Sequence, residues 1–222
     1  FTGDNPLEDK NGHGTHVAGI AAAKPIVIGT PPNEKTFCAG VSAGAPIVSI
    51  QVLNKQGIGK WHNLKKAIDH LIRVGHTGDI VNMSLGAYCV DNCPNAKPAL
   101  RNDIKKLADL GLFVVMAAGN DGGDAMLSLP GCIDHTNVYT VGAIDCLNKC
   151  APYSNYGANV DWLTVGTNVM STYKNGRFAI MSGTSMSTAV VSGIIHANNG
   201  PPTSAGTVSC SVGLGTNIAQ RY

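Results

Sequence analysis

Short apolar runs alternate along the chain with segments whose apolar residues recur every three or four positions. The runs are Ile47–Leu53, Ile80–Leu85, Phe113–Ala118 and Val138–Ile144. Runs of this length that are rich in β-branched residues are typical of strands buried on both faces of a sheet. The sequence therefore predicts four short buried strands.

Two segments between these runs have the periodicity of amphipathic helices. The first has apolar residues at i, i+3, i+4, i+7 and i+8, namely Leu64, Ala67, Ile68, Leu71 and Ile72. The second repeats the pattern at Leu100, Ile104, Leu107 and Ala108, and Gly111 is placed to end it. Alternating strands and helices predict an α/β domain, in which helices cover both faces of a parallel sheet. Ligands of such sheets bind at the carboxyl ends of the strands.

Composition supports one globular domain over residues 1–222. Of the 222 residues 44% are hydrophobic and 14% charged, and the formal net charge is +2. This content supports a core, while the charge balance provides no basic surface for nucleic acid or an anionic membrane. The longest apolar run, Leu112–Ala118, is far shorter than the roughly 18 residues that a membrane span needs. After Asn198 we expect a loop followed by a short, weakly apolar end.

Cysteine content and the N-terminus bear on location. The seven cysteines are Cys38, Cys89, Cys93, Cys132, Cys146, Cys150 and Cys210. So many cysteines indicate an oxidising compartment and disulfides, and the first residue, Phe1, indicates that any targeting peptide has been removed. Buried free thiols are the alternative, whereas the CxxxC spacings do not favour zinc. Because seven is odd, one sulfur is free or pairs outside this chain.

Two histidines three residues apart, His13 and His16, open a stretch of small apolar residues. They lack the HExxH spacing and glutamate of a zinc site. They are either structural histidines bonded to the backbone or, for His13 between two glycines, a general base whose ring is open to a substrate.

Ser185 precedes a helical stripe formed by Met186, Ala189, Val190, Gly193 and Ile194. It therefore lies at a helix N-terminus, where unpaired N–H groups and the helix dipole favour an anion. The alternative is an ordinary N-cap serine. The motif is not a GxSxG elbow, because position 187 is serine.

Asn120 follows the run Phe113–Ala118 directly. At the carboxyl end of a strand its amide can donate a hydrogen bond to a developing oxyanion. The alternative is an Asn-Asp-Gly turn, which is common.

Taken together and in this order, HGTHVAG from His13, AAGN up to Asn120 and GTSM around Ser185 resemble the subtilisin-like serine proteases, the subtilases. The resemblance spans roughly residues 9–195. It implies a three-layer α/β/α fold and a secreted serine endopeptidase, made as a zymogen, that forms an acyl-enzyme. It also implies that His13 is the general base, Ser185 the nucleophile and Asn120 a donor to the oxyanion.

The same resemblance implies where a polypeptide substrate binds. One edge consists of Gly57, Ile58 and Gly59, with Trp61 as the wall of an outer pocket. The opposite edge consists of Ser84, Leu85 and Gly86, with Ala118 and Gly119 beside it. Glycine-rich edges leave backbone groups free to pair with an added strand. The pocket residues predict a preference for an apolar side chain.

The chain departs from the family at the third member of the triad, an Asp on a strand upstream of the histidine. Asp9 aligns with a position next to the substrate's second pocket, and Asp4 follows a glycine in a loop, so neither is assigned. One explanation is a separate N-terminal fragment that carries the Asp; others are a lost N-terminus or a non-enzymatic peptide-binding or structural module with this fold. No cofactor is assigned, and structural Ca²⁺ is compatible with the family without identifiable ligands here.

Overall fold

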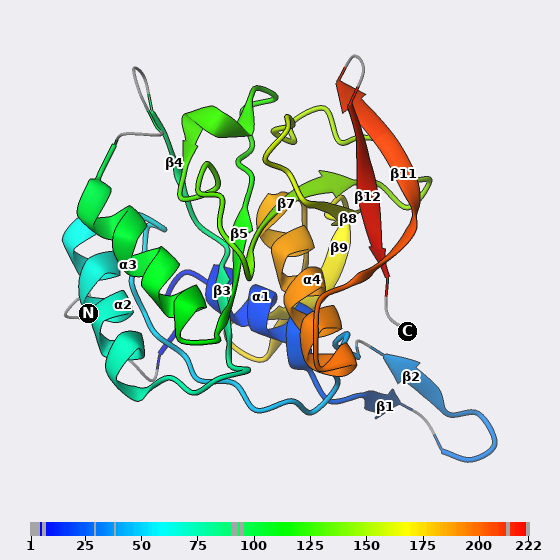
Figure 1. Ribbon diagram of the computed structural model, residues 1–222. Coiled ribbons are helices and arrows are strands. Elements are labelled where there is room, and N and C mark those ends of the chain that lie inside the picture. Colours follow the sequence, from blue (N-terminus) through cyan, green and yellow to red (C-terminus); the bar gives the residue numbers. More distant parts are fainter. Residues whose placement is uncertain are drawn as a thin grey trace.

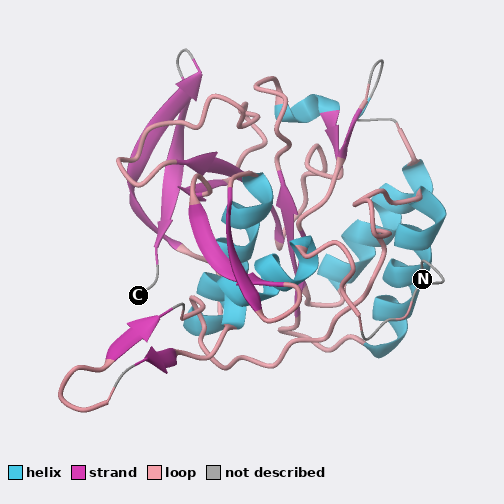
Figure 2. Ribbon diagram, turned by 180° about the vertical axis from the view of Figure 1, so that it is seen from behind, coloured by secondary structure: helices cyan, strands magenta, loops and turns pink. Residues whose placement is uncertain are grey.

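A six-stranded sheet forms the centre of the protein, in the strand order β11-β12-β8-β7-β5-β3 (Figure 1). Helices lie on both of its sides, as the opposite view also shows (Figure 2). This is a computed structural model, and it describes residues 5, 8–28, 30–37, 39–89, 93, 96–211 and 214–220. The arrangement is the predicted three-layer α/β/α fold.

Four parallel strands make up the middle of the sheet. They are β3 (Ile80–Met83), β5 (Phe113–Ala117), β7 (Val138–Ile144) and β8 (Trp162–Val165). Each pairs with the next in parallel. Three of these strands coincide with predicted apolar runs. The fourth, β8, has only four residues, two of them buried, and its pattern did not identify it.

The sheet is covered by α2 (Trp61–Val74) and α3 (Pro98–Asp109) on one face and by α4 (Thr184–Asn198) on the other. Strand β5 shows why both faces are apolar. Val114 and Met116 pack with the apolar stripes of α2 and α3, while Val115 packs with α4. All three side chains are fully buried, which is worth about 1.5–3 kcal/mol each.

Helix α1 (His13–Ala22) packs against α4 and against β9 (Val169–Tyr173), which forms an antiparallel hairpin with β10 (Arg177–Met181). The small residues of α1 allow this close approach. A side chain at Gly19 would collide with Ser171 and Thr172.

Four short strands and one 3₁₀ turn complete the described fold. Strands β1 (Ile26–Ile28) and β2 (Lys35–Phe37) form a hairpin that projects from the body of the molecule (Figure 1). Strand β4 (Ala87–Tyr88) pairs with β6 (Ser128–Leu129), which follows a 3₁₀ turn, η2 (Ala125–Leu127).

The loop expected after Asn198 is present only at residues 199–202, and the end that follows it is a pair of strands. Strand β11 (Thr203–Ser211) and strand β12 (Leu214–Gln220) form an antiparallel pair, and β12 extends the central sheet in parallel to β8. The pair is rich in Ser, Thr and Gly and largely exposed, so it lacks the apolar alternation by which strands are recognised.

The expectation of a buried strand at Ile47–Leu53 is wrong. The segment forms no strand in the described part of the chain, and a single-residue bridge joins Leu53 to Gly59. Ile47 is 53% exposed and Val48 is 85% exposed. The apolar pattern is that of a buried strand, but no described strand pairs with it, and β3 forms the edge of the sheet.

Both expected states of the cysteines, disulfide-bonded and free, occur in the structure. Cys150 and Cys210 form a disulfide that joins the loop after β7 to β11. Cys89, Cys93, Cys132 and Cys146 are free thiols, two of them buried, and Cys38 lies outside the described residues. Within the described ranges, no helix is both long and apolar enough to cross a membrane.

Candidate active site

His13, Asn120 and Ser185 line one cavity of about 410 Å³. They come from three separate segments: the first turn of α1, the loop after β5 and the first turn of α4. The structure therefore brings together the three motifs that lie more than 60 residues apart along the chain.

The start of α1 places His13. Gly12 adopts a left-handed conformation with φ of 102°, and a side chain there would collide with the Tyr173 ring. The Asp9 carboxylate accepts hydrogen bonds from the backbone N–H of Asn11 (3.0 Å), Gly12 (2.7 Å) and Thr15 (2.8 Å). These donors are the unpaired groups of a helix N-terminus, so Asp9 fixes the turn from which His13 projects.

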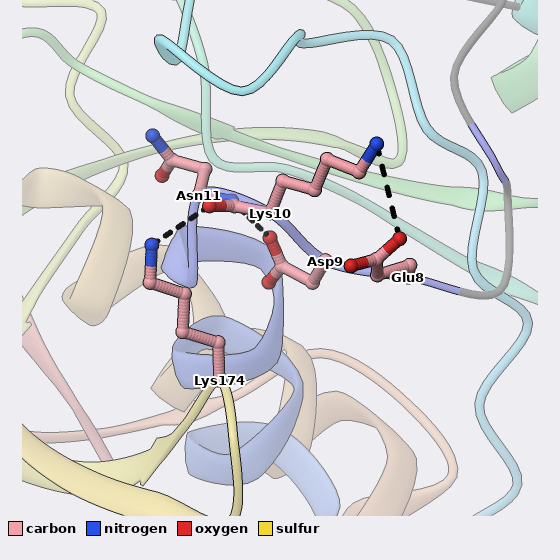
Figure 3. Close-up of polar contacts among 5 residues, drawn as sticks. All are labelled: Glu8, Asp9, Lys10, Asn11 and Lys174. Atoms are coloured by element: carbon pink, nitrogen blue, oxygen red, sulfur yellow. Dashed lines mark hydrogen bonds and ion pairs between the residues drawn. The ribbon is translucent and has the colours of Figure 1, made fainter.

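Figure 3 shows that this loop is further tied to neighbouring segments. Lys174, which follows β9, donates to the backbone oxygen of Lys10 at 2.7 Å, and Lys10 forms an exposed ion pair with Glu8 at 3.8 Å. Burial alone would raise the pKa of Asp9, but its hydrogen bonds from Gly12, Thr15 and Asn11 outweigh burial and lower it. Asp9 is therefore an ionised anchor of the loop, and none of its hydrogen bonds goes to the His13 ring.

The two histidines have different environments. His16 is fully buried, and its Nε2 lies 3.0 Å from the backbone oxygen of Ala179, so it is a structural histidine. His13 is half-buried and lines the cavity. Burial lowers the pKa of His13, nearby His16 lowers it further, and Asp9 opposes the shift. The lowered pKa favours the neutral imidazole near pH 7, the form that accepts a proton.

Ser185 is held against the end of β3. Its hydroxyl donates to the backbone oxygen of Ser84 at 3.3 Å, and the Ser84 hydroxyl donates to the backbone oxygen of Ser185 at 2.8 Å. The first contact is long for a bond between oxygens, so the Ser185 hydroxyl is weakly held and can rotate.

The hydrogen bonds of Asn120 define the orientation of its amide. Its Oδ1 accepts from the backbone N–H of Thr184 at 2.8 Å and from the Thr184 hydroxyl at 3.1 Å. A backbone N–H can only donate, so the atom that faces it is the amide oxygen. The Nδ2 group, a donor, has no partner among the described residues. The loop before Ser185 thus aims the Asn120 amide.

Six of the predicted substrate-binding residues line the cavity: Gly57, Gly59, Trp61, Ser84, Leu85 and Gly86. Three do not. Ile58 is 65% exposed, Ala118 is fully buried in the core, and Gly119 packs beside Asn155 and Ser128.

Sequence reasoning did not single out several other lining residues, namely Asn11, Val52, Leu53, Lys60, Leu64, Ala87 and Met181. Leu64 has a helical pattern that predicts core, and it serves both core and cavity. Met181 ends a hairpin strand that no motif marks. Only the folded chain places these residues at the cavity.

In the described part of the chain, the His13 ring has no hydrogen-bond partner, from a carboxylate or from Ser185. Asp4 lies outside the described residues. Nor do the described residues include a group of three or more His, Cys, Asp or Glu side chains that could hold a metal ion. The cavity therefore contains a base, a hydroxyl and an amide donor, without a visible group to orient the base.

Comparison with known proteins adds three results. The model of the Subtilase family matches residues 2–197. An intracellular serine protease of Paenibacillus polymyxa is 37% identical over 193 residues, which are 85% of this chain and 54% of the relative. Proteinase T of Parengyodontium album is 35% identical over 87% of this chain and 60% of its own length.

The fold has a solved counterpart as well. A cold adapted subtilisin-like serine proteinase superimposes with a TM-score of 0.72 at 28% identity, covering 87% of this chain and 64% of the other. A thermophilic serine proteinase of Bacillus sp. (strain AK1), 35% identical, is covered over 42% of its length. The chain thus spans about half the length of the curated relatives it matches.

Proposed function

The chain belongs to the subtilase family, and on that premise we propose that it is a serine endopeptidase that cleaves peptide bonds through an acyl-enzyme on Ser185. The observation that supports the proposal is the meeting of His13, Asn120 and Ser185 at one cavity. The family relationship does not favour the alternative of a non-enzymatic peptide-binding module.

In the proposed reaction the Ser185 hydroxyl breaks its hydrogen bond to the backbone oxygen of Ser84. It then transfers its proton to neutral His13, and its oxygen attacks the peptide carbonyl carbon. The carbonyl oxygen becomes an oxyanion, which accepts hydrogen bonds from Asn120 Nδ2 and from the backbone N–H of Ser185. Protonated His13 gives its proton to the leaving amine, and the acyl-enzyme remains. Water then attacks the ester with His13 again as the base.

The substrate is a polypeptide in an extended conformation. Gly57, Gly59 and Gly86 offer backbone with little side-chain bulk on the two edges of the cavity. Leu53, Trp61, Leu64 and Met181 give part of the lining an apolar surface. We therefore expect cleavage next to apolar side chains, and a peptide library with a strong preference for basic residues would contradict this.

The group that orients His13 is proposed to come from another segment, such as a separate N-terminal fragment that carries the family's aspartate. Two features support a docking position for a strand. Strand β3 is the edge of the described sheet, and two apolar side chains of the segment 47–53, those of Ile47 and Val48, are exposed. Ser84, which follows β3, and Val52 both line the cavity. Unpaired edges of this kind are sites where a strand is added.

Location remains part of the proposal. The Cys150–Cys210 disulfide supports an oxidising compartment, such as the exterior of the cell. Detection of the protein in the culture medium or in an oxidising organelle would support it, and a cytosolic pool alone would refute it.

The proposed activity is tested with a fluorophosphonate probe, which labels only activated serines. We expect labelling of Ser185, its loss in Ser185→Ala and in His13→Ala, and no loss in Ser187→Ala, a matched control two residues along the same helix. In subtilisin itself, loss of the serine costs about 2 × 10⁶ in kcat. The absence of labelling in protein that also contains the orienting acid would refute the proposal.

A further inference from the structure

Three thiols meet behind the wall of the cavity. Cys93 and Cys132 are buried, and their sulfur atoms lie 2.9 Å apart although the residues are 39 positions apart in sequence. Half-buried Cys89 also interacts with Cys93. Arg101 of α3 donates to Cys132 Sγ and to the backbone oxygen of Cys93, both at 3.2 Å.

This arrangement is better suited to disulfide chemistry than to a metal. Within the described ranges no group of three His, Cys, Asp or Glu side chains is arranged to bind a metal ion. The 2.9 Å separation is closer than two unbonded sulfur atoms normally pack, and a small shift of the side chains brings them to the bonding distance of about 2.05 Å.

We propose that Cys93 and Cys132 form a reversible disulfide, with Cys89 as the thiol through which this pair exchanges with a small-molecule disulfide such as oxidised glutathione. Cys89 is the sulfur of the three that solvent reaches best. Thiol–disulfide exchange begins when a thiolate attacks a disulfide in line with the bond that breaks. Because glutathione comes from solution, the first attacking sulfur has to be accessible to it.

The exchange balances in three steps. The Cys89 thiolate attacks oxidised glutathione and releases one glutathione thiolate, which leaves a mixed disulfide on Cys89. Cys93 attacks the Cys89 sulfur and releases the second glutathione. Cys132 then attacks the Cys93 sulfur, and Cys89 leaves as a thiol. Two cysteine thiols are oxidised, one glutathione disulfide is reduced, and the two protons end on the two glutathione thiols.

The surroundings affect two of these steps. Burial raises the pKa of the Cys93 thiol, and the neighbouring Cys132 and Cys89 add to the shift, so little Cys93 thiolate is present and Cys93 reacts slowly, with an adjacent sulfur such as that of Cys89. The Arg101 guanidinium places a positive charge beside Cys132, the sulfur that attacks in the last step.

The site lies next to the substrate-binding wall. The backbone N–H of Cys89 donates to Leu127 at 2.7 Å, directly beyond the β4–β6 pair, and that of Cys132 donates to Ser128 at 2.7 Å. Gly86 and Ala87, which line the cavity, lead into β4. A Cys93–Cys132 bond therefore joins the two segments that follow β4 and β6 and restrains the wall.

The chemical test uses the full protein, equilibrated in oxidised or reduced glutathione, alkylated and mapped by mass spectrometry. We expect a linked Cys93–Cys132 peptide pair in the oxidised sample and two alkylated peptides in the reduced one. Formation should slow at least tenfold in Cys89→Ser but not in Cys146→Ser, a control at an exposed thiol outside the cluster. A linked Cys89–Cys93 pair as the final product, or free Cys93 and Cys132 in oxidising buffer, would overturn the proposal.

Two further measurements report the effect of the Cys93–Cys132 disulfide on stability and on catalysis. Oxidation should raise the melting temperature by about 5–15 °C, as expected for a crosslink that closes a loop of this size, and Cys132→Ser should abolish that rise. The effect on catalysis rests on the proposed function: oxidation should change KM for peptides more than kcat. If the protein cleaves no peptide, the mapping and melting results still decide whether the disulfide forms.

Discussion

The two sides of the cavity are held in different ways. On the α4 side, Asn120 is hydrogen-bonded to Thr184, and Ser185 is hydrogen-bonded to Ser84. Strand β5, which leads to Asn120, is almost completely buried. On the α1 side, the backbone is anchored by Asp9, but the His13 ring has no hydrogen bond within the described residues. The proposed oxyanion donor is thus held in place by its neighbours, whereas the proposed base has no orienting partner among the described residues.

This difference follows from the sheet. Among the described strands, β5, β7 and β8 each have two neighbours in the sheet, whereas β3 has one, and Ile47 and Val48 in the segment 47–53 are exposed. Electrostatic stabilisation requires only rigid donors, which a closed core supplies. Orientation of an imidazole requires a second polar group on its far nitrogen, and the open edge is the place where such a group can be added.

The largest predicted effect comes from adding a group that orients His13 on the α1 side of the cavity. A strand bearing a carboxylate that pairs with the edge at β3 should raise kcat by about 10⁴, since in subtilisin itself loss of the triad Asp costs about 3 × 10⁴. The measurement compares peptide hydrolysis by residues 1–222 alone with hydrolysis after addition of the fragment. A fragment with Asn in place of its Asp is the matched control, and an equal gain with both would show that the fragment only stabilises the fold.

The next largest effect is expected from a substitution on the α4 side of the cavity, at Asn120. Asn120→Ala should lower kcat by about 10²–10³ with little change in KM, because in the proposed reaction the amide donates a hydrogen bond only to the oxyanion. It also removes the acceptor for the Thr184 backbone N–H, so stability is expected to fall as well.

Asn120→Asp separates these two roles. The aspartate keeps an oxygen for Thr184 but replaces the donor with an acceptor, so kcat should fall at least as far while the melting temperature changes less than in Asn120→Ala. If Asn120→Asp retained full activity, Asn120 would not be an oxyanion donor.

The sequence predicted the central strands of the sheet better than the segment at Ile47 or the last two strands. The runs at Ile80, Phe113 and Val138 became strands because their neighbours are present and both faces are covered. The same kind of pattern at Ile47 misled, because an apolar run records that a strand has the composition for burial and does not record whether a partner is there. The β11–β12 pair was missed for the opposite reason, since its Ser- and Thr-rich strands lie exposed.

For the site, short motifs identified the residues of the first turns, where glycine and small side chains mark close approach. Contacts between distant segments left no such signal. The bonds from Asn120 to Thr184 and between Ser84 and Ser185 depend on how α4 sits on the ends of β3 and β5. The meeting of Cys93 with Cys132 depends on the β4–β6 pair, which has two residues in each strand.

A smaller effect is expected at the anchor of α1. Asp9→Ala removes both carboxylate oxygens, which accept from Gly12 and Thr15 among others, and should destabilise the protein by about 1–3 kcal/mol. Thermal unfolding should show a drop in melting temperature of about 2–10 °C. Glu8→Ala removes only an exposed ion pair from the same loop and should leave the melting temperature unchanged. Equal effects of the two variants would contradict the anchoring role.

The smallest effect is a shift in pH dependence. Burial lowers the pKa of His13, and His16 lowers it further, so the neutral base persists below pH 6.5. The acidic limb of kcat/KM should therefore have its midpoint below 6.5. Asp9 acts in the opposite direction, so Asp9→Asn should move the limb to lower pH. A carboxylate added beside His13 stabilises the imidazolium and should move the limb upward.

The same shifts predict a change in stability. The unfolded histidines bind protons near pH 6.5, whereas folded His13 and His16 both resist protonation. The free energy of unfolding should thus be fully retained above pH 6.5 and fall as the pH is lowered from there towards the depressed pKa values. His16→Gln should reduce this fall if it folds, and His13→Gln should do so without affecting the core. A stability curve that rises on acidification through this range would show that neither ring is held neutral, and the proton-transfer side of the cavity would then have to be reassigned.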